Sequence, residues 1–203
     1  MNTKQKTQEL TMLAILAALV IVLQTLSAFG VLKVGLFSIT LTLVPIVVGG
    51  ILLGPRDGAI LGFVFGLMVC IFSVTGVDVG GLMVFQTNAA LGWIICLLKG
   101  VAAGFIPALV YKALPKKHPV LSAFIAAILA PIANTGIFIC GMLLFFRPLL
   151  ESWKAGGAQA ADSMFLYVIL GLCGVNFLIE FAVNAVLSPA IATIVKTVRK
   201  QKN

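Results

Sequence analysis

Long apolar runs separated by short polar breaks dominate the pattern of this chain. A transmembrane helix needs about 20 predominantly apolar residues, and the pattern predicts six membrane spans, of which the second and third are the shortest. The predicted spans cover about residues 10–29, 40–53, 59–74, 88–111, 120–146 and 164–195. The breaks after the second, third, fourth and fifth spans predict turns or loops at residues 54–58, 75–87, 112–119 and 147–163. We therefore expect one all-α membrane domain over residues 1–203, folded as a compact bundle of six transmembrane helices.

The composition agrees with the pattern. The 203 residues are 61% hydrophobic and 10% charged, with a mean hydropathy of +1.17. Ordinary soluble domains contain about 45–50% apolar and about 25% charged residues. A water-soluble enzyme or a disordered regulator is therefore excluded, and no large domain outside the membrane fits this length.

The basic residues predict the orientation of the spans. The net charge is +8, but the basic residues lie at the ends of apolar runs, which indicates membrane orientation and argues against a nucleic-acid partner. If both termini are cytoplasmic, the inner segments hold ten lysines and arginines and the outer loops hold three. Since cytoplasmic loops carry the excess of positive charge, we expect N-in and C-in.

The sequence lacks the motifs of an enzyme or a metal site. The cysteines, Cys70, Cys96, Cys140 and Cys173, each lie inside an apolar run without metal-ligand spacing, so we expect buried, reduced thiols. His118 lies in the basic turn between lysines and a proline, where it fits a solvated turn residue. No catalytic triad, HExxH or nucleotide-binding loop is present. We expect no metal, no cofactor and no ATP hydrolysis by this chain.

Five polar residues inside the predicted spans are candidates for a binding site. Polar groups inside a membrane are costly and often functional, and these are Lys99, Asn134, Asn176, Glu180 and Asn184. A rise of 1.5 Å per residue places them roughly 18–30 Å from the cytoplasmic end. Asn176, Glu180 and Asn184 are spaced i, i+4, i+8, which favours one helix face. Two interpretations remain open: Lys99 and Glu180 neutralise each other in the structure, or they line an outward-facing pocket where Lys99 binds an anionic group.

The predicted outer loops and the entry to the fourth span contribute further candidates for the wall or lid of this pocket. They are Phe37, Gln86, Asn88 and Trp93. Interfacial aromatic residues commonly form a belt at the membrane surface, which is the alternative for Trp93.

Small residues repeat every four positions in several spans. Gly54, Gly58, Gly62 and Gly66 line one helix face, and Ala14 and Ala18 repeat the spacing in the first span. Such faces let helix backbones approach closely. They fit either internal packing or docking of a partner helix, and Ala14 and Ala18 are the strongest candidates for docking.

These features together resemble the substrate-binding S components of energy-coupling factor (ECF) transporters, the vitamin importers of bacteria. The resemblance covers nearly the whole chain and rests on three stretches. They are residues 10–19 with the Ala-x-x-x-Ala pattern, residues 43–59 with their Gly-Pro-Arg-Asp-Gly turn, and residues 176–189.

The resemblance implies a function in the bacterial plasma membrane. An S component captures a vitamin from outside, associates with a membrane T component and two cytoplasmic ATPase subunits, and topples in the membrane to deliver its substrate. Ala14 and Ala18 would then belong to the surface that meets the T component.

The substrate is predicted from the same resemblance. The chain looks most like S components assigned to pantothenate, where Lys99 would suit a carboxylate and the asparagines would suit hydroxyl and amide groups. Riboflavin is the alternative, although a flavin ring favours more aromatic lining than the sequence assigns, and pyridoxine or a hydroxymethylpyrimidine also remain open. A ligand-free membrane assembly or anchor protein is the alternative from another class.

Overall fold

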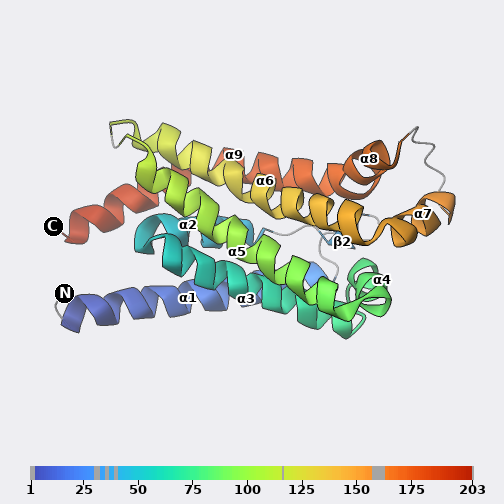
Figure 1. Ribbon diagram of the computed structural model, residues 1–203. Helices are drawn as coiled ribbons and strands as arrows, with labels where there is room; N and C mark the ends of the chain where they lie inside the picture. The colour runs from blue at the N-terminus through green and yellow to red at the C-terminus, as the bar shows by residue number, and fades with distance from the viewer. Residues whose placement is uncertain are drawn as a thin grey trace.

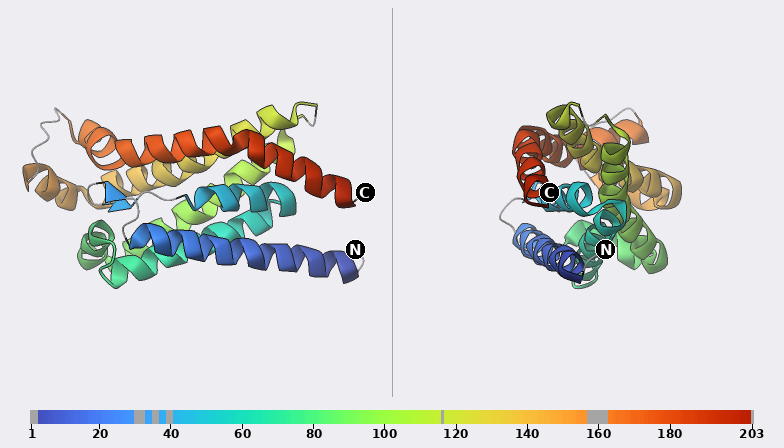
Figure 2. Two further views of the ribbon diagram at one scale, coloured as in Figure 1. Left: turned by 180° about the vertical axis from the view of Figure 1, so that it is seen from behind. Right: turned by 90° about the vertical axis from the view of Figure 1, so that its left-hand side faces the viewer.

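A bundle of helices makes up the part of the chain that the computed structural model describes, residues 3–29, 33–34, 37–38, 41–115, 117–156 and 163–202 (Figure 1). The helices are α1 (Thr3–Ala28), α2 (Leu43–Leu53), α3 (Pro55–Val74), α4 (Val79–Thr87), α5 (Ala89–Ala113), α6 (Pro119–Phe145), α7 (Arg147–Gly156), α8 (Met164–Leu166) and α9 (Gly174–Lys202), with a π-helical segment, η1 (Tyr167–Cys173), leading into α9. Two short strands, β1 (Lys33–Val34) and β2 (Phe37–Ser38), pair antiparallel with Lys33 opposite Ser38. Both ends of the chain lie at one end of the bundle, whereas α4, α7 and β2 lie at the other (Figure 1 and Figure 2).

Within the described residues, five helices are long and apolar enough to cross a membrane. They are α1 over Gln5–Ala28, α3, α5, α6 and α9 over Asn176–Thr197. The second predicted span forms a helix of only 11 residues, α2. At 1.5 Å per residue α2 is about 16 Å long, roughly half of the 30 Å hydrocarbon core. It lies towards the end of the bundle that holds the termini (Figure 1).

The predicted breaks differ from the structure in three places. Residues 54–58 were expected to form a turn, but only Gly54 breaks the helices, with φ of 115°. Pro55 then begins α3, because a proline at the first helical position loses no hydrogen bond. The predicted loops 75–87 and 147–163 contain α4 and α7. In α4, tertiary packing overrides the low helix propensity of glycine, because Gly80 and Gly81 are both buried.

The glycine face of α3 packs against α5 and not against an outside partner. A Cβ added at Gly62 would collide with the backbone oxygen of Gly100, and one added at Gly66 would lie 2.6 Å from the backbone oxygen of Cys96. A Cβ added at Gly104 would collide with the oxygen of Gly58. The two helices therefore touch backbone to backbone, as small-xxx-small faces allow.

Among the described residues, two large apolar clusters pack the bundle, beside a smaller one at Cys70, Phe85 and Cys96. One surrounds α2 and includes Leu43, Ile46, Leu61 and Ile191, each at most 1% exposed. The other joins α6, α7 and η1 through residues such as Met142. Large apolar side chains also remain exposed on the outer helix faces, where lipid rather than water is the expected surrounding.

Candidate functional site

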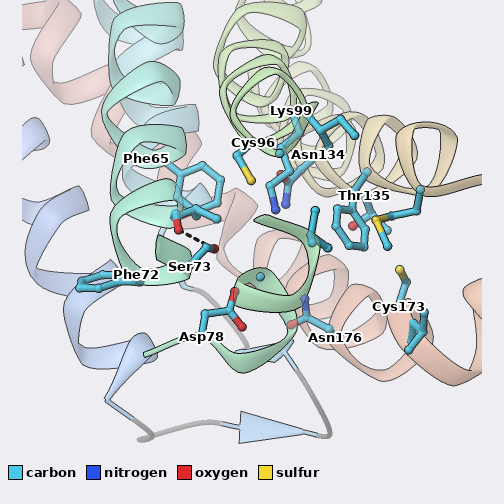
Figure 3. A pocket seen from close by; sticks show the side chains of 18 of the residues that line it. Phe65, Phe72, Ser73, Asp78, Cys96, Lys99, Asn134, Thr135, Cys173 and Asn176 are labelled. Carbon is cyan, nitrogen blue, oxygen red and sulfur yellow. Dashed lines mark hydrogen bonds between the residues drawn. The ribbon is translucent and has the colours of Figure 1, made fainter. Parts of the chain in front are cut away.

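A cavity lies in the half of the bundle away from the termini, and polar side chains from several helices point into it (Figure 3). Its position follows from the short α2, whose preceding residue, Thr42, donates a hydrogen bond of 3.2 Å to Gln24 in the cavity wall. The wall is formed by Gln24, Ala28, Phe65, Val69, Phe72, Ser73, Asp78, Gly81, Val84, Phe85, Gly92, Ile95, Cys96, Lys99, Asn134, Thr135, Phe138, Met142, Leu172, Cys173, Asn176 and Glu180.

Among the described residues of the cavity wall, Lys99 is the one with a positively charged side chain. It lies on α5, is half-buried, and places its Nζ 5.0 Å from the centroid of the Phe138 ring on α6. An ammonium over an aromatic face is stabilised by the ring quadrupole. This contact holds the charge at the cavity while leaving its three hydrogen-bond donors available to a ligand.

Two asparagines offer amide groups to the same space. Asn134 on α6 is 6% exposed, and Asn176 on α9 is half-buried. The Oδ1 atoms of both accept no hydrogen bond from any described residue. Buried polar atoms are normally paired, so these two amides fit a site that is completed by a ligand.

Two carboxyl groups line the cavity as well. Glu180 on α9 is 1% exposed. Asp78 directly precedes α4 and lies against Ser73 and Gly81, since a Cβ at Gly81 would meet an Asp78 carboxylate oxygen at 2.7 Å. Figure 3 shows Lys99 and Asn134 reaching into the cavity from one side and Asp78 and Asn176 from the other.

The rest of the wall is mostly apolar and includes several aromatic rings. Phe65, Phe72, Phe85 and Phe138 all line the cavity. The free space is about 90 Å³, well below the roughly 300–1,000 Å³ of typical small-molecule pockets. A vitamin-sized ligand must therefore displace side chains or the helices that close the site.

Some predicted site residues lie elsewhere. Asn184 is outside the cavity, and its Nδ2 donates to the Glu180 carbonyl oxygen at 2.8 Å. Gln86 is exposed, and Asn88 caps α5 by accepting a hydrogen bond from the Leu91 amide at 3.1 Å. Trp93 is 37% exposed and packs on Phe85. The backbone of Phe37 is in β2, and its side chain lies outside the described part of the structure.

Several cavity residues escaped the sequence prediction. Gln24 is an amide inside an apolar run, so the criterion that selected Asn134 would also have selected it. Asp78 lies in a glycine-rich stretch that was predicted to be a loop, and only the lone carboxyl among apolar residues could have indicated it. Ser73 and Thr135 carry no such signal, because both side chains are common in membrane helices.

Comparison with known proteins shows to which family this chain belongs. A family profile described as "ECF transporter, substrate-specific component" matches residues 8–192. The chain belongs to this family. This ECF substrate-specific component is also similar to the pantothenic acid transporter PanT of Lactococcus lactis subsp. cremoris (strain MG1363), with 28% identity over 199 residues and 93% of each chain covered.

Family and structure agree on the kind of protein. With five helices able to cross a bilayer in the described part of the chain, this ECF substrate-specific component is a multi-pass bacterial membrane protein. The resemblance inferred from residues 10–19, 43–59 and 176–189 is confirmed. Transport by this family implies a substrate and an energising module of membrane and ATPase subunits.

Proposed function

We propose that this S component binds pantothenate in the cavity around Lys99 and delivers it to an ATPase-driven transport module. The observation that carries the proposal is the arrangement of one lysine, two amides and aromatic rings around one space in the half of the bundle away from the termini (Figure 1). The similarity to PanT over 93% of the chain supports the choice of vitamin.

The chemistry of pantothenate matches the wall group by group. The molecule has a carboxylate at one end, a central amide, and two hydroxyls beside a dimethyl-substituted carbon at the other end. Lys99 binds the carboxylate, and Asn134 and Asn176 exchange hydrogen bonds with the amide and hydroxyl groups. Phe65 and Phe72 pack on the dimethyl carbon.

The membrane arrangement is part of the proposal. The six apolar helices, including the short α2, lie in the bilayer with both termini cytoplasmic, so that the cavity opens outwards. Ala14 and Ala18 are both exposed on α1. Their spacing supports a docking surface for the T component, which in turn couples to two cytoplasmic ATPase subunits.

Riboflavin is a second candidate because one observation favours it. Four phenylalanines line the cavity, which is more aromatic lining than the sequence had assigned. The free space of about 90 Å³ argues for the smaller ligand, since a three-ring flavin needs a larger rearrangement.

The test compares two ligands that differ at the proposed contact. Pantothenol carries an alcohol where pantothenate carries a carboxylate. A charge-assisted hydrogen bond contributes about 1.5–3 kcal/mol, so Lys99→Gln should weaken pantothenate binding roughly tenfold to a hundredfold and leave pantothenol binding nearly unchanged. Lys112→Gln, on the exposed end of the same helix, is the matched control and should affect neither ligand.

Isothermal titration calorimetry of the purified protein gives the affinities. Equal weakening of both ligands in Lys99→Gln would show that Lys99 supports the fold rather than the carboxylate. Binding of riboflavin in place of pantothenate would transfer the assignment to the flavin. Absence of binding to either vitamin or to pyridoxine, with a folded sample, would refute vitamin capture and favour an assembly role.

A further inference from the structure

A second cavity lies at the end of the bundle that holds the chain termini (Figure 1). Its wall is formed by the end of α2, the start of α3, the end of α5 and the start of α6, and it shares no residue with the wall around Lys99. Its free space is about 450 Å³, within the roughly 300–1,000 Å³ of typical small-molecule pockets. This cavity therefore has room for a ligand without a rearrangement of the helices.

Close contacts between the helices fix the shape of this second cavity. A Cβ added at Gly50 on α2 would lie 2.9 Å from the Ala108 Cβ and 3.1 Å from the Gly104 oxygen on α5. On the other side, the Ser122 hydroxyl of α6 donates a hydrogen bond of 3.3 Å to the Pro115 carbonyl oxygen in the turn after α5. Both sides of the cavity are thus held by the fold, which favours a preformed site.

The charge of this wall is positive. Among its described residues two are basic and none is acidic. Arg56 lies in the first turn of α3 and Lys112 in the last turn of α5. Asp57 follows Arg56 in the chain and offsets part of its charge, but it is not part of the wall. A guanidinium and an ammonium group at one cavity favour an anion, and both groups form charge-assisted hydrogen bonds with phosphate oxygens.

The level of the two cations in the membrane fits a lipid headgroup. Helices α3 and α5 are both able to cross a bilayer, and α3 begins at Pro55 whereas α5 ends at Ala113. Arg56 and Lys112 therefore lie where these two spans end, beside the roughly 30 Å hydrocarbon core and inside the headgroup region. Basic pockets between transmembrane helices at this level bind anionic headgroups.

We propose that this second cavity binds the phosphate group of an anionic phospholipid, with Arg56 and Lys112 as the cationic donors. Leucines such as Leu52 and Leu114 continue the same wall and pack against the ester region and the first methylene groups of the lipid. A soluble anion or an acidic side chain of a partner protein needs no such apolar wall. The bound lipid joins the start of α3 to the end of α5 at the membrane surface, whatever vitamin the protein carries.

Native mass spectrometry of the detergent-purified full chain counts the bound lipids and gives their affinities. The probes are phosphatidylglycerol, which is anionic, phosphatidylcholine, whose choline balances the phosphate charge, and glycerol phosphate, which lacks acyl chains. A charge-assisted hydrogen bond corresponds to roughly a tenfold to hundredfold change in affinity. The first phosphatidylglycerol should therefore bind at least about tenfold more tightly than the second, or than phosphatidylcholine. Glycerol phosphate should bind more weakly than phosphatidylglycerol.

A double variant tests the two cations. Arg56→Gln combined with Lys112→Gln should weaken the first phosphatidylglycerol by about tenfold or more and so remove its preference. Lys6→Gln combined with Lys196→Gln is the matched control, because it removes the same charge from exposed positions of α1 and α9 outside the wall. The control should keep the preferred first lipid. An unchanged affinity for pantothenate shows that both double variants are folded.

Three outcomes would overturn the proposal. An equal loss of lipid affinity in the two double variants would mean that the anionic lipid is attracted by the net charge and not by this cavity. Glycerol phosphate that binds as tightly as phosphatidylglycerol would make the ligand a soluble anion. Absence of a preferred first phosphatidylglycerol from the wild-type protein would leave the cavity to an acidic side chain of a partner protein.

Hydrogen exchange of the wild-type protein decides if the Arg56 and Lys112 double variant does not fold. Phosphatidylglycerol, and not phosphatidylcholine, should slow the exchange of backbone amides in residues 54–58 and 111–115, which border the cavity. Equal exchange with both lipids would overturn the proposal.

Discussion

The contact between α3 and α5 makes a specific prediction about Gly62. An alanine Cβ at this position would collide with the Gly100 oxygen and lie 2.8 Å from the Gly100 carbonyl carbon and 3.2 Å from the Val101 Cα. All three are backbone atoms, so no side-chain rotation relieves the contact. Reaching 3.4 Å from 2.8 Å requires the helices to separate by at least about 0.6 Å.

The cost can be isolated with a matched glycine. A Cβ at Gly136 on α6 meets nothing within 4 Å, so Gly136→Ala gains only the lower backbone entropy of alanine, about 0.5–1 kcal/mol. Gly62→Ala gains the same amount but adds overpacking of about 1–3 kcal/mol. The difference between the two variants is therefore the overpacking alone.

Thermal unfolding of the detergent-purified variants measures this difference. For a chain of this size, 1 kcal/mol corresponds to a shift in Tm of about 2–4 °C. Gly62→Ala should therefore unfold roughly 2–12 °C below Gly136→Ala. Equal Tm values would show that α3 and α5 do not touch through their backbones, and the reasoning would be wrong.

Two other substitutions separate stability from binding. Asn88→Ala removes the cap of α5 and should cost about 1 kcal/mol of stability, while the affinity for pantothenate stays unchanged and Asn88→Ser restores the Tm. A loss of affinity in a folded Asn88→Ala sample would show that Asn88 belongs to the binding site. Leu61→Ala, at a fully buried position of the cluster around α2, should lower the free energy of unfolding by about 2–5 kcal/mol. Calorimetry on the monodisperse fraction should show an unchanged Kd for pantothenate. A loss of stability below about 1 kcal/mol would mean that this cluster is loosely packed.

The long helices were predictable because length and hydrophobicity decide them. Helices α5 and α6 begin and end within two residues of the predicted spans 88–111 and 120–146. Helix α4 was not predictable, because its glycines favour a loop locally and are overridden by packing against Ser73 and Asp78. The predicted turn at residues 54–58 was only partly correct. The chain changes direction at Gly54, but α3 already begins at Pro55.

The grouping of polar residues at one cavity was predictable where depth in the membrane decides it. Lys99, Asn134, Asn176 and Glu180 meet at one cavity, as their matched heights indicated. Asn184 does not reach it, because each step of four residues turns a helix face by about 40° and two steps turn it by about 80°. The outer residues Gln86 and Asn88 lie outside the cavity wall for another reason: α4 leaves Gln86 exposed, and Asn88 caps the start of α5.

The π-helical segment η1 sets the rotation of the last helix. A π-helix holds more residues per turn than an α-helix, and η1 covers the seven residues Tyr167–Cys173 immediately before α9. Removing one residue from η1 would turn Asn176 and Glu180 by about 100° around the helix axis, away from Lys99, without changing the composition of the helix. A chimera that takes its last helix from another substrate-specific component should therefore be joined before Tyr167. The π-helical segment then comes from the same protein as the helix whose rotation it sets.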